Sequence, residues 1–338
     1  MKLPIVSETS IKGRRVLVRL DTDVPLENGK VVDDYRLKSA LPTLELLKKY
    51  AAQIIILGHI DHPQRRDTAF SIRPIANYLS DLLHEEITVV ELEESKKEND
   101  KKVRILENLR FNNGEEKNDS KFVKRLAQLG DFYINESFAD SHRRHASIVG
   151  LPKLLPHGAG FHLTQEVEHL LRILEKPKDP VIIIIGGAKS DKVTYIDKLL
   201  DHADWVLVGG LLPRVVSSYC RMHDGRACVV AGFLDPTGRD IDEVSATNFA
   251  AMVANAGTVV WNGPLGEYEK ETFRKGTEVV ARALGESDAY KVVGGGDTVA
   301  VLKNLGILDT MDWVSTGGGA MLEFLAEGDL PGLKALRI

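Results

Sequence analysis

The chain has 338 residues, of which 43% are hydrophobic and 28% charged, and its formal net charge is −5. This length allows two domains with separate cores, and the acidic balance argues against binding to nucleic acid or to anionic membranes. The longest apolar run, around Ile182–Ile185, is too short to cross a bilayer, and the first ten residues lack the apolar stretch of a signal peptide, so we expect a cytoplasmic protein. Cys220 and Cys228 match neither a disulfide framework nor a zinc site, which favours a reducing compartment.

The first half of the sequence alternates between short apolar runs and segments with helical periodicity. The runs predict strands over 15–21, 53–59, 87–90, 102–106 and 132–137. The helical periods predict helices over 36–50, 72–83 and 120–129. Asn28–Gly29 predicts a hairpin turn, and the charged segment 91–102 a solvated loop. This alternation is typical of a parallel sheet with helices on its faces.

The segment 151–160 (LPKLLPHGAG) contains two prolines and two glycines and predicts a domain boundary. A helix over 164–174 follows it, and a second alternating series runs from Val181 to Ala326. We therefore predict an α/β protein of two doubly wound, Rossmann-like parallel-sheet lobes joined by a helix and hinge. The expected lobes are residues 1–158, with a C-terminal tail at 322–338 packed on them, and residues 159–321.

Five apolar strands in the second half end in glycine. They are found in VIIIIGGAKSDK, WVLVGG, TVVWNGPLG, KVVGGGDT and WVSTGGGA. The carboxyl ends of parallel strands lie along one edge of a sheet, where ligands bind. At Gly294–Gly296 a phosphate can approach the backbone closely, and Asp297 is placed to cap the following helix and to hold Mg²⁺. The pattern fits neither the dinucleotide nor the P-loop motif, but its repetition favours a phosphate-bearing ligand over plain strand-to-helix turns.

Polar residues collect just after the strands of the first half. They are Asp21, Asp23, Arg36, His59, His62, Arg110 and the cluster Ser141-His142-Arg143-Arg144-His145. Arginine is suited to bidentate contact with phosphate or carboxylate. Any single arginine at a strand end is explained by exposure alone, whereas the set predicts a pocket for a small, multiply charged anion. Transfer of a phosphoryl group needs positioning and charge neutralisation rather than a catalytic base.

The chain resembles the phosphoglycerate kinase family over nearly its whole length. The resemblance lies in VLVRLDTDVPLENGKVVDDYRLKSALPTL, ENLRFNNGEEKND, SHRRHASIVG, GGAKSDK, VVWNGPLGEYE, VVGGGDT and VSTGGGAMLEFL, in that order. It implies reversible phosphoryl transfer between 1,3-bisphosphoglycerate and Mg-ADP, giving 3-phosphoglycerate and Mg-ATP in glycolysis or gluconeogenesis. It also implies a glycerate-binding N-terminal lobe, a nucleotide-binding C-terminal lobe, hinge closure, and Mg²⁺ with ATP or ADP as co-substrate. Nothing in the sequence indicates a dimer, so we expect a monomer without nucleic-acid or membrane partners.

The resemblance implies a role for each residue at a matching position. Substrate-binding residues would be Asp21, Asp23, Arg36, His59, His62, Arg110 and Arg143. Catalytic residues would be Arg36, Lys189, Gly295 and Gly318. Nucleotide-binding residues would be Gly187, Lys189, Lys192, Gly210, Asn262, Pro264, Glu269, Gly294, Gly295, Gly296, Asp297 and Thr298, with Asp297 as the magnesium ligand.

Several positions depart from the family pattern. They are Asp23 for Asn, Asp61-His62 for Gly-Arg, Ala139-Asp140 for Gly-Thr, and two residues instead of three between Lys189 and Lys192. The added acids lie beside a site for a dianion, and the nucleotide lobe is abbreviated between Leu211 and Val244. Two alternatives therefore stand beside the kinase. One is a relative that acts on a different, less charged carboxylated substrate, and the other is a nucleotide-binding or regulatory protein without turnover.

Overall fold

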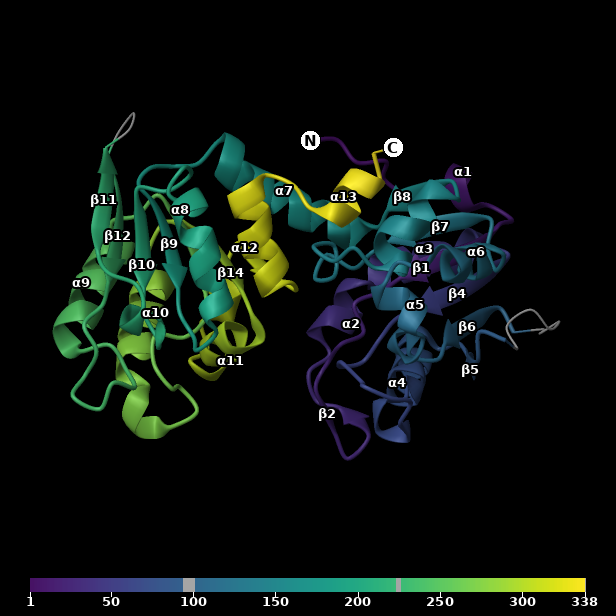
Figure 1. Cartoon of the computed structure of the whole chain (residues 1–338), viewed down its shortest axis with the longest axis horizontal. Helices are drawn as coiled ribbons and strands as arrows, with labels where there is room; N and C mark the ends of the chain where they lie inside the picture. The colour runs from purple at the N-terminus through teal and green to yellow at the C-terminus, as the bar shows by residue number, and fades with distance from the viewer. Residues whose placement is uncertain (94–100, 223–225, 338) are drawn as a thin grey trace. The chain divides into compact units, whose positions relative to one another are not determined.

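The computed structural model describes residues 1–93, 101–222 and 226–337, so most of the predicted loop at 91–102 lies outside the described residues. The chain divides into two compact units (Figure 1). Unit 1 is Met1–Val167 with the tail from Leu330, and unit 2 is Glu168–Asp329. The division falls inside helix α7 (Phe161–Glu175), nine residues after the boundary predicted from the sequence at 158/159. Residues 322–327, which the sequence analysis placed in the tail, belong to a helix of unit 2.

Unit 1 contains a six-stranded sheet in the order β5-β6-β4-β1-β7-β8, and all its strand pairs are parallel. Its strands are β1 (Arg15–Arg19), β4 (Gln53–Leu57), β5 (Ile87–Val90), β6 (Val103–Leu106), β7 (Phe132–Asn135) and β8 (His157–Ala159). Its helices are α1 (Glu8–Ile11), α2 (Tyr35–Ser39), α3 (Leu41–Tyr50), α4 (Arg73–Leu83), α5 (Asn113–Glu116), α6 (Ser120–Ala127) and α13 (Pro331–Ala335). The hairpin β2 (Leu26–Glu27) and β3 (Lys30–Val31) turns at Asn28 and Gly29, which confirms that prediction.

The predicted strands of unit 1 are confirmed, but three of them end two residues early, at Arg19, Leu57 and Asn135. The residues that follow leave the ladder and form loops at the carboxyl edge of the sheet. The predicted helix over 36–50 is two helices, which meet at Ala40, and Pro42 lies in the first turn of α3. Strand β8 was not predicted, because it lies in the proline- and glycine-rich segment taken as a boundary.

Unit 2 contains a seven-stranded sheet in the order β11-β12-β10-β9-β13-β14-β15. Its strands are β9 (Val181–Ile185), β10 (Trp205–Val208), β11 (Tyr219–Met222), β12 (Arg226–Ala231), β13 (Thr258–Asn262), β14 (Tyr290–Gly294) and β15 (Trp313–Ser315). Its helices are α8 (Ile196–Leu199), α9 (Glu243–Ala254), α10 (Lys275–Glu286), α11 (Gly296–Asn304) and α12 (Gly318–Glu327). Strands β9 and β13 are buried along their whole length, as expected for central parallel strands covered on both faces.

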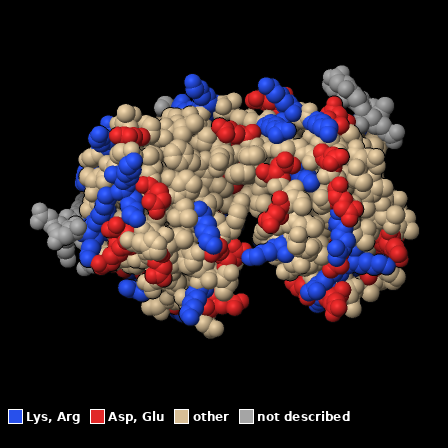
Figure 2. Space-filling view, turned by 180° about the vertical axis from the view of Figure 1, so that it is seen from behind, with Lys and Arg blue, Asp and Glu red and all other residues tan. Residues whose placement is uncertain are grey.

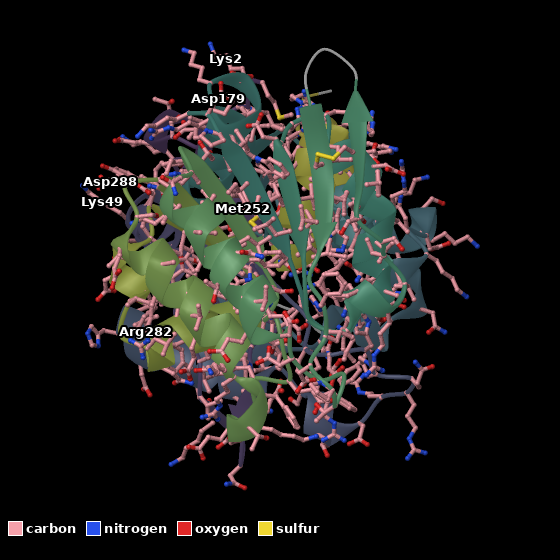
Figure 3. All side chains as sticks on the ribbon, turned by 90° about the vertical axis from the view of Figure 1, so that its left-hand side faces the viewer. Lys2, Lys49, Asp179, Met252, Arg282 and Asp288 are labelled. Atoms are coloured by element: carbon pink, nitrogen blue, oxygen red, sulfur yellow. A yellow bond between two sulfur atoms is a disulfide. The ribbon has the colours of Figure 1, made fainter. Side chains whose placement is uncertain are left out.

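The edge of the second sheet corrects one prediction. Strand β11 pairs antiparallel with β12, and the register places Cys220 directly opposite Cys228. The two cysteines form a disulfide, visible in Figure 3 as a yellow bond between neighbouring strands. The prediction of unpaired cysteines was therefore wrong, because the segment around Tyr219 gave no clear strand signal and the hairpin that joins the cysteines was not recognised.

Figure 2 shows basic and acidic side chains intermixed on the visible face of each unit. In the described ranges, no helix combines the length and apolar character that a membrane span requires.

Candidate functional site

In unit 1, four loops leave the sheet at its carboxyl edge, after the neighbouring strands β6, β4, β1 and β7. Two of these loops are joined by Thr22, whose hydroxyl donates to the His59 carbonyl (2.7 Å) and accepts from the His59 amide (2.8 Å). Gly58 allows this contact, because a Cβ at that position would lie 2.4 Å from Thr22 Oγ1. The loops therefore hold their polar side chains in one cluster.

Arg36 reaches this cluster from α2. Its Nη1 donates to the Asp23 carbonyl (2.7 Å) and lies 3.3 Å from Asp21 Oδ1. Asp23 in turn accepts from the Asp61 amide (2.8 Å). Burial raises the pKa of Asp21 to about 6, although the positive charge of Arg36 acts to lower it. The second carboxylate oxygen of Asp21 is buried and has no hydrogen-bond partner within the described residues, so it is available to a ligand.

A buried ion pair, Arg19 with Asp140, lies beside this group. Arg19 Nη2 donates to Asp140 Oδ2 (2.9 Å) and lies 2.8 Å from His59 Nδ1. Burial alone would raise the pKa of Asp140, but Arg19, His59, the Ser137 hydroxyl and Arg110 together outweigh it and hold that pKa well below its usual range. Burial, followed by the charge of Arg19, lowers the pKa of His59 well below its ordinary value, so this imidazole is neutral at pH 7.

Arg110 completes the cluster. Its Nη1 donates to the Asp61 carbonyl (2.7 Å) and lies 3.3 Å from His62 Nε2. The same guanidinium lies 3.5 Å from Glu116 and 3.9 Å from Asp140. It therefore joins the loops after β4, β6 and β7.

Most of the residues predicted for unit 1 thus lie together. The cluster contains Asp21, Asp23, Arg36, His59, His62 and Arg110. Arg143 is exposed, and within the described residues no ion pair joins its side chain to the cluster. Sequence analysis missed Arg19, although a charged residue inside the apolar strand VLVRL is itself a signal, because a buried charge needs a partner.

In unit 2, the carboxyl ends of the strands are joined by backbone contacts between glycines and their neighbours. The Gly186 amide donates to the Asn262 carbonyl (2.9 Å), and the Gly187 amide to the Pro264 carbonyl (2.7 Å). A Cβ on Gly186 would lie 2.2 Å from the Pro264 oxygen. Gly210 has φ +63°, and a Cβ there would lie 2.5 Å from the Gly187 nitrogen. This edge is therefore closely packed backbone with few side chains.

The turn before α11 presents unpaired donors. Gly295 is the N-cap residue at φ +91°, and no side chain caps the helix, so the prediction that Asp297 is the cap was wrong. Asn262 Nδ2 is buried and has no partner within the described residues. A Cβ on Gly318 would lie 2.5 Å from that nitrogen and 2.6 Å from the Gly295 nitrogen, so the two nitrogens lie close together beside Gly318. Such a group of N–H donors at a helix start is suited to an anion.

Three other predicted residues lie around this turn. Thr298 is buried and accepts from the Gly263 amide (2.7 Å), which ties the α11 turn to the end of β13. Gly294 closes β14 and is buried, whereas Gly296 opens α11 and is exposed.

The two lysines predicted for the phosphates differ in their surroundings. Lys192 Nζ donates to the Gly186 carbonyl (2.9 Å), and burial lowers its pKa to about 8. Lys189 is exposed on the loop before the 3₁₀ segment Ser190–Tyr195. The Glu269 side chain is also exposed. The structure therefore places Lys192 among the glycine turns.

A magnesium ion bound with a nucleotide fits these residues. Asp297 is an exposed carboxylate in the first turn of α11. Within the described residues, no group of three or more His, Cys, Asp or Glu side chains forms a metal cage. Mg²⁺ commonly keeps several waters and takes one or two carboxylates together with substrate phosphates, so a single carboxylate beside a phosphate site is sufficient.

Comparisons with known proteins agree with this arrangement. The family model described as phosphoglycerate kinase matches residues 6–231 and 234–328. The chain is 35% identical to a phosphoglycerate kinase of Leptospira biflexa over 392 residues, covering 99% of this chain and 98% of that protein. It is 37% identical to one of Rubrobacter xylanophilus, covering 98% and 97% of the two chains. The solved structure of phosphoglycerate kinase from Coxiella burnetii superposes with a TM-score of 0.80 at 30% identity, covering 99% of both chains.

Proposed function

The chain belongs to the phosphoglycerate kinase family, and we propose that it transfers a phosphoryl group reversibly between 1,3-bisphosphoglycerate and Mg-ADP, giving 3-phosphoglycerate and Mg-ATP. The full-length match carries this proposal, because relatives about a third identical cover nearly all of the chain. The alignments are longer than the 338 residues of this chain, so the relatives contain segments that it lacks.

Unit 1 is the proposed glycerate site. The free oxygen of Asp21 can accept a hydrogen bond from the glycerate hydroxyl. Arg36 and Arg110 supply charged donors suited to carboxylate and phosphate oxygens. The exposed Arg143 adds a cation near the loop after β7.

Unit 2 is the proposed nucleotide site. The amides at the start of α11, the Asn262 amide and Lys192 bind the phosphates. Asp297 holds Mg²⁺, which neutralises charge on the phosphate oxygens when it is bound. Glu269 binds the ribose hydroxyls, and Gly187, Gly210 and Pro264 shape the floor beneath the nucleotide.

Transfer requires a state in which the two substrates meet, because different units bind them. In that state Arg36 and Lys189 stabilise the charge of the moving phosphoryl group, and amides at Gly295 and Gly318 contact its oxygens. Each preorganised donor of this kind typically stabilises a transition state by about 3–4 kcal/mol. The residues position the carboxylate and phosphate in line and exclude water, and no general base is required.

The test is a coupled assay of purified protein with 3-phosphoglycerate and Mg-ATP, accompanied by calorimetry with the nucleotide alone. We expect turnover that depends on both substrates, with Arg36→Ala as the inactive control. Nucleotide binding without turnover would reject the kinase and favour the regulatory alternative. Turnover with another carboxylated compound, but not with 3-phosphoglycerate, would favour a changed substrate.

A further inference from the structure

Asp140 is a carboxylate surrounded by cations at the carboxyl edge of the unit 1 sheet. It accepts from Arg19 Nη2 (2.9 Å) and from the Ser137 hydroxyl (2.8 Å). Its oxygens lie 3.8 Å from His59 Nδ1 and 3.9 Å from Arg110 Nη2. Its side chain is only 8% exposed, so water screens these interactions weakly.

Three arginines of this pocket already have acidic partners. Arg19 pairs with Asp140, Arg36 with Asp21, and Arg110 lies between Asp140 and Glu116. The imidazoles of His59 and His145 add no charge at neutral pH, because burial lowers the pKa of His145 to about 4 and that of His59 well below its usual value. Apart from the exposed Arg143, an incoming phosphate therefore meets guanidinium groups whose charge is largely compensated.

We propose that Asp140 determines which substrate charge this pocket accepts: it weakens binding of a phosphate dianion relative to that of a singly charged carboxylate. The inference rests on the proposed function, which places the substrate in this pocket. Two like charges a few ångströms apart repel strongly where solvent is scarce, and the repulsion grows with the charge of the ligand. Loss of the Asp140 charge would also remove one of the two acidic neighbours of Arg110 and leave more of its charge available to the ligand.

The test compares Asp140→Asn with the wild-type chain, because asparagine keeps the size and a carbonyl acceptor while removing the charge. Calorimetry gives the Kd of 3-phosphoglycerate and of D-glycerate, which differ in the phosphate group. We expect Asp140→Asn to bind 3-phosphoglycerate about tenfold or more tightly and to change D-glycerate by less than about threefold. The Kd of Mg-ADP, bound by unit 2, remains unchanged.

Asp131→Asn is the matched control. Asp131 also pairs with an arginine, Arg15, but it precedes β7 whereas Asp140 follows it, so it lies at the opposite edge of the same sheet. This variant removes the same formal charge from the same unit. Both Kd values are expected to stay at their wild-type level.

Three outcomes decide the proposal. Unchanged or weaker binding of 3-phosphoglycerate by Asp140→Asn, with normal Mg-ADP binding, would show that Asp140 only holds Arg19 in place. If neither glycerate compound binds the wild type or the variant, the proposed function fails as well. Asp140→Thr, which carries the threonine of the family pattern, is a second variant. If both variants fail to fold, the wild-type chain still decides the proposal. We expect it to bind 3-phosphoglycerate less than about tenfold more tightly than D-glycerate, and a difference of about a hundredfold overturns the proposal.

Discussion

The candidate sites of the two units are built from different kinds of chemical group, side chains in unit 1 and mostly backbone amides in unit 2. In unit 1 the candidate site consists of charged side chains, and Arg19, Arg36 and Arg110 each lie beside an acid. In unit 2 it consists mostly of backbone amides, held by glycines such as Gly295 at φ +91°. The first site is therefore sensitive to the balance of charges and the second to the space that a Cβ would fill.

The two kinds of site also differ in how the burial of their polar groups affects the stability of the folded protein. A buried ion pair such as Arg19–Asp140 gains attraction but loses the hydration of both charges, so its net contribution to folding is small, whereas removing one partner typically costs about 3–5 kcal/mol. Backbone donors carry only partial charges and lose less on burial. This difference explains why the proposed phosphate site of unit 2 can be assembled with few counter-ions.

The largest effect is expected at Arg36. Replacement by alanine should lower kcat for 3-phosphoglycerate by roughly 10³-fold, because an arginine that neutralises a transferred phosphoryl group is worth about that much. The Kd of Mg-ADP should not change. Steady-state kinetics and calorimetry measure the two quantities, and Lys38→Ala, on the same helix and paired with Asp34, is the control. Near wild-type turnover of Arg36→Ala would remove Arg36 from the transfer step.

The next largest effect is expected in unit 2, where the single methyl group added by Gly318→Ala should weaken nucleotide binding. The Cβ of Gly318→Ala would lie 2.5 Å from Asn262 Nδ2 and 2.6 Å from the Gly295 nitrogen. Overpacking of this kind costs about 1–3 kcal/mol, so Mg-ADP should bind about 10- to 100-fold more weakly. The neighbouring Gly319→Ala meets no atom within 4 Å and serves as the control, with unchanged affinity. Equal effects of the two substitutions would mean that helix propensity, not the turn, is responsible.

The fold was largely predictable from the sequence because each unit repeats one local pattern. Apolar runs such as Ile54–Leu57 and Val181–Ile185 are buried on both faces, and their unbroken apolar sequence predicts this burial. The Asn28–Gly29 turn was predictable for a local reason too, since both residues adopt positive φ. The short strand β8 has no such pattern, and its place in the sheet comes from pairing with β7.

The contacts within the sites were less predictable, since they depend on loops that meet only after folding. Sequence analysis identified Asp140 as an unusual acid but could not show that Arg19, far away in the chain, neutralises it. It assigned both Lys189 and Lys192 to the nucleotide phosphates, whereas the structure directs Lys192 to the Gly186 carbonyl and leaves Lys189 exposed. The Cys220–Cys228 bridge was missed for the same reason, since it follows from hairpin register.

A smaller effect is expected at Asp297. Replacement by alanine should weaken Mg-ADP binding about tenfold, because one charged ligand to the ion is lost. The effect should vanish or reverse when Mg²⁺ is removed with a chelator, since the carboxylate then only repels the phosphates. Asp309→Ala, an exposed acid beyond α11, is the control. A tenfold loss that persists without Mg²⁺ would assign Asp297 to the helix rather than to the ion.

A pH dependence of nucleotide binding separates the two sites. The Lys192 pKa is about 8, so the ammonium is present at pH 7 and is lost as the pH rises through 8. Phosphate binding requires the charged form, and above pH 8 it therefore requires uptake of a proton. The affinity for ADP should fall by up to about tenfold per pH unit in that range.

Lys192→Arg should remove this dependence, because the guanidinium stays protonated throughout. Calorimetry between pH 7 and about pH 9.5 measures both slopes, and D-glycerate binding to unit 1 is the internal control. Its neighbouring arginines remain charged and Asp21 is already ionised above pH 7, so its affinity should be flat. Equal slopes for wild type and Lys192→Arg would place the titrating group elsewhere in unit 2 and leave Lys192 without a role in binding phosphate.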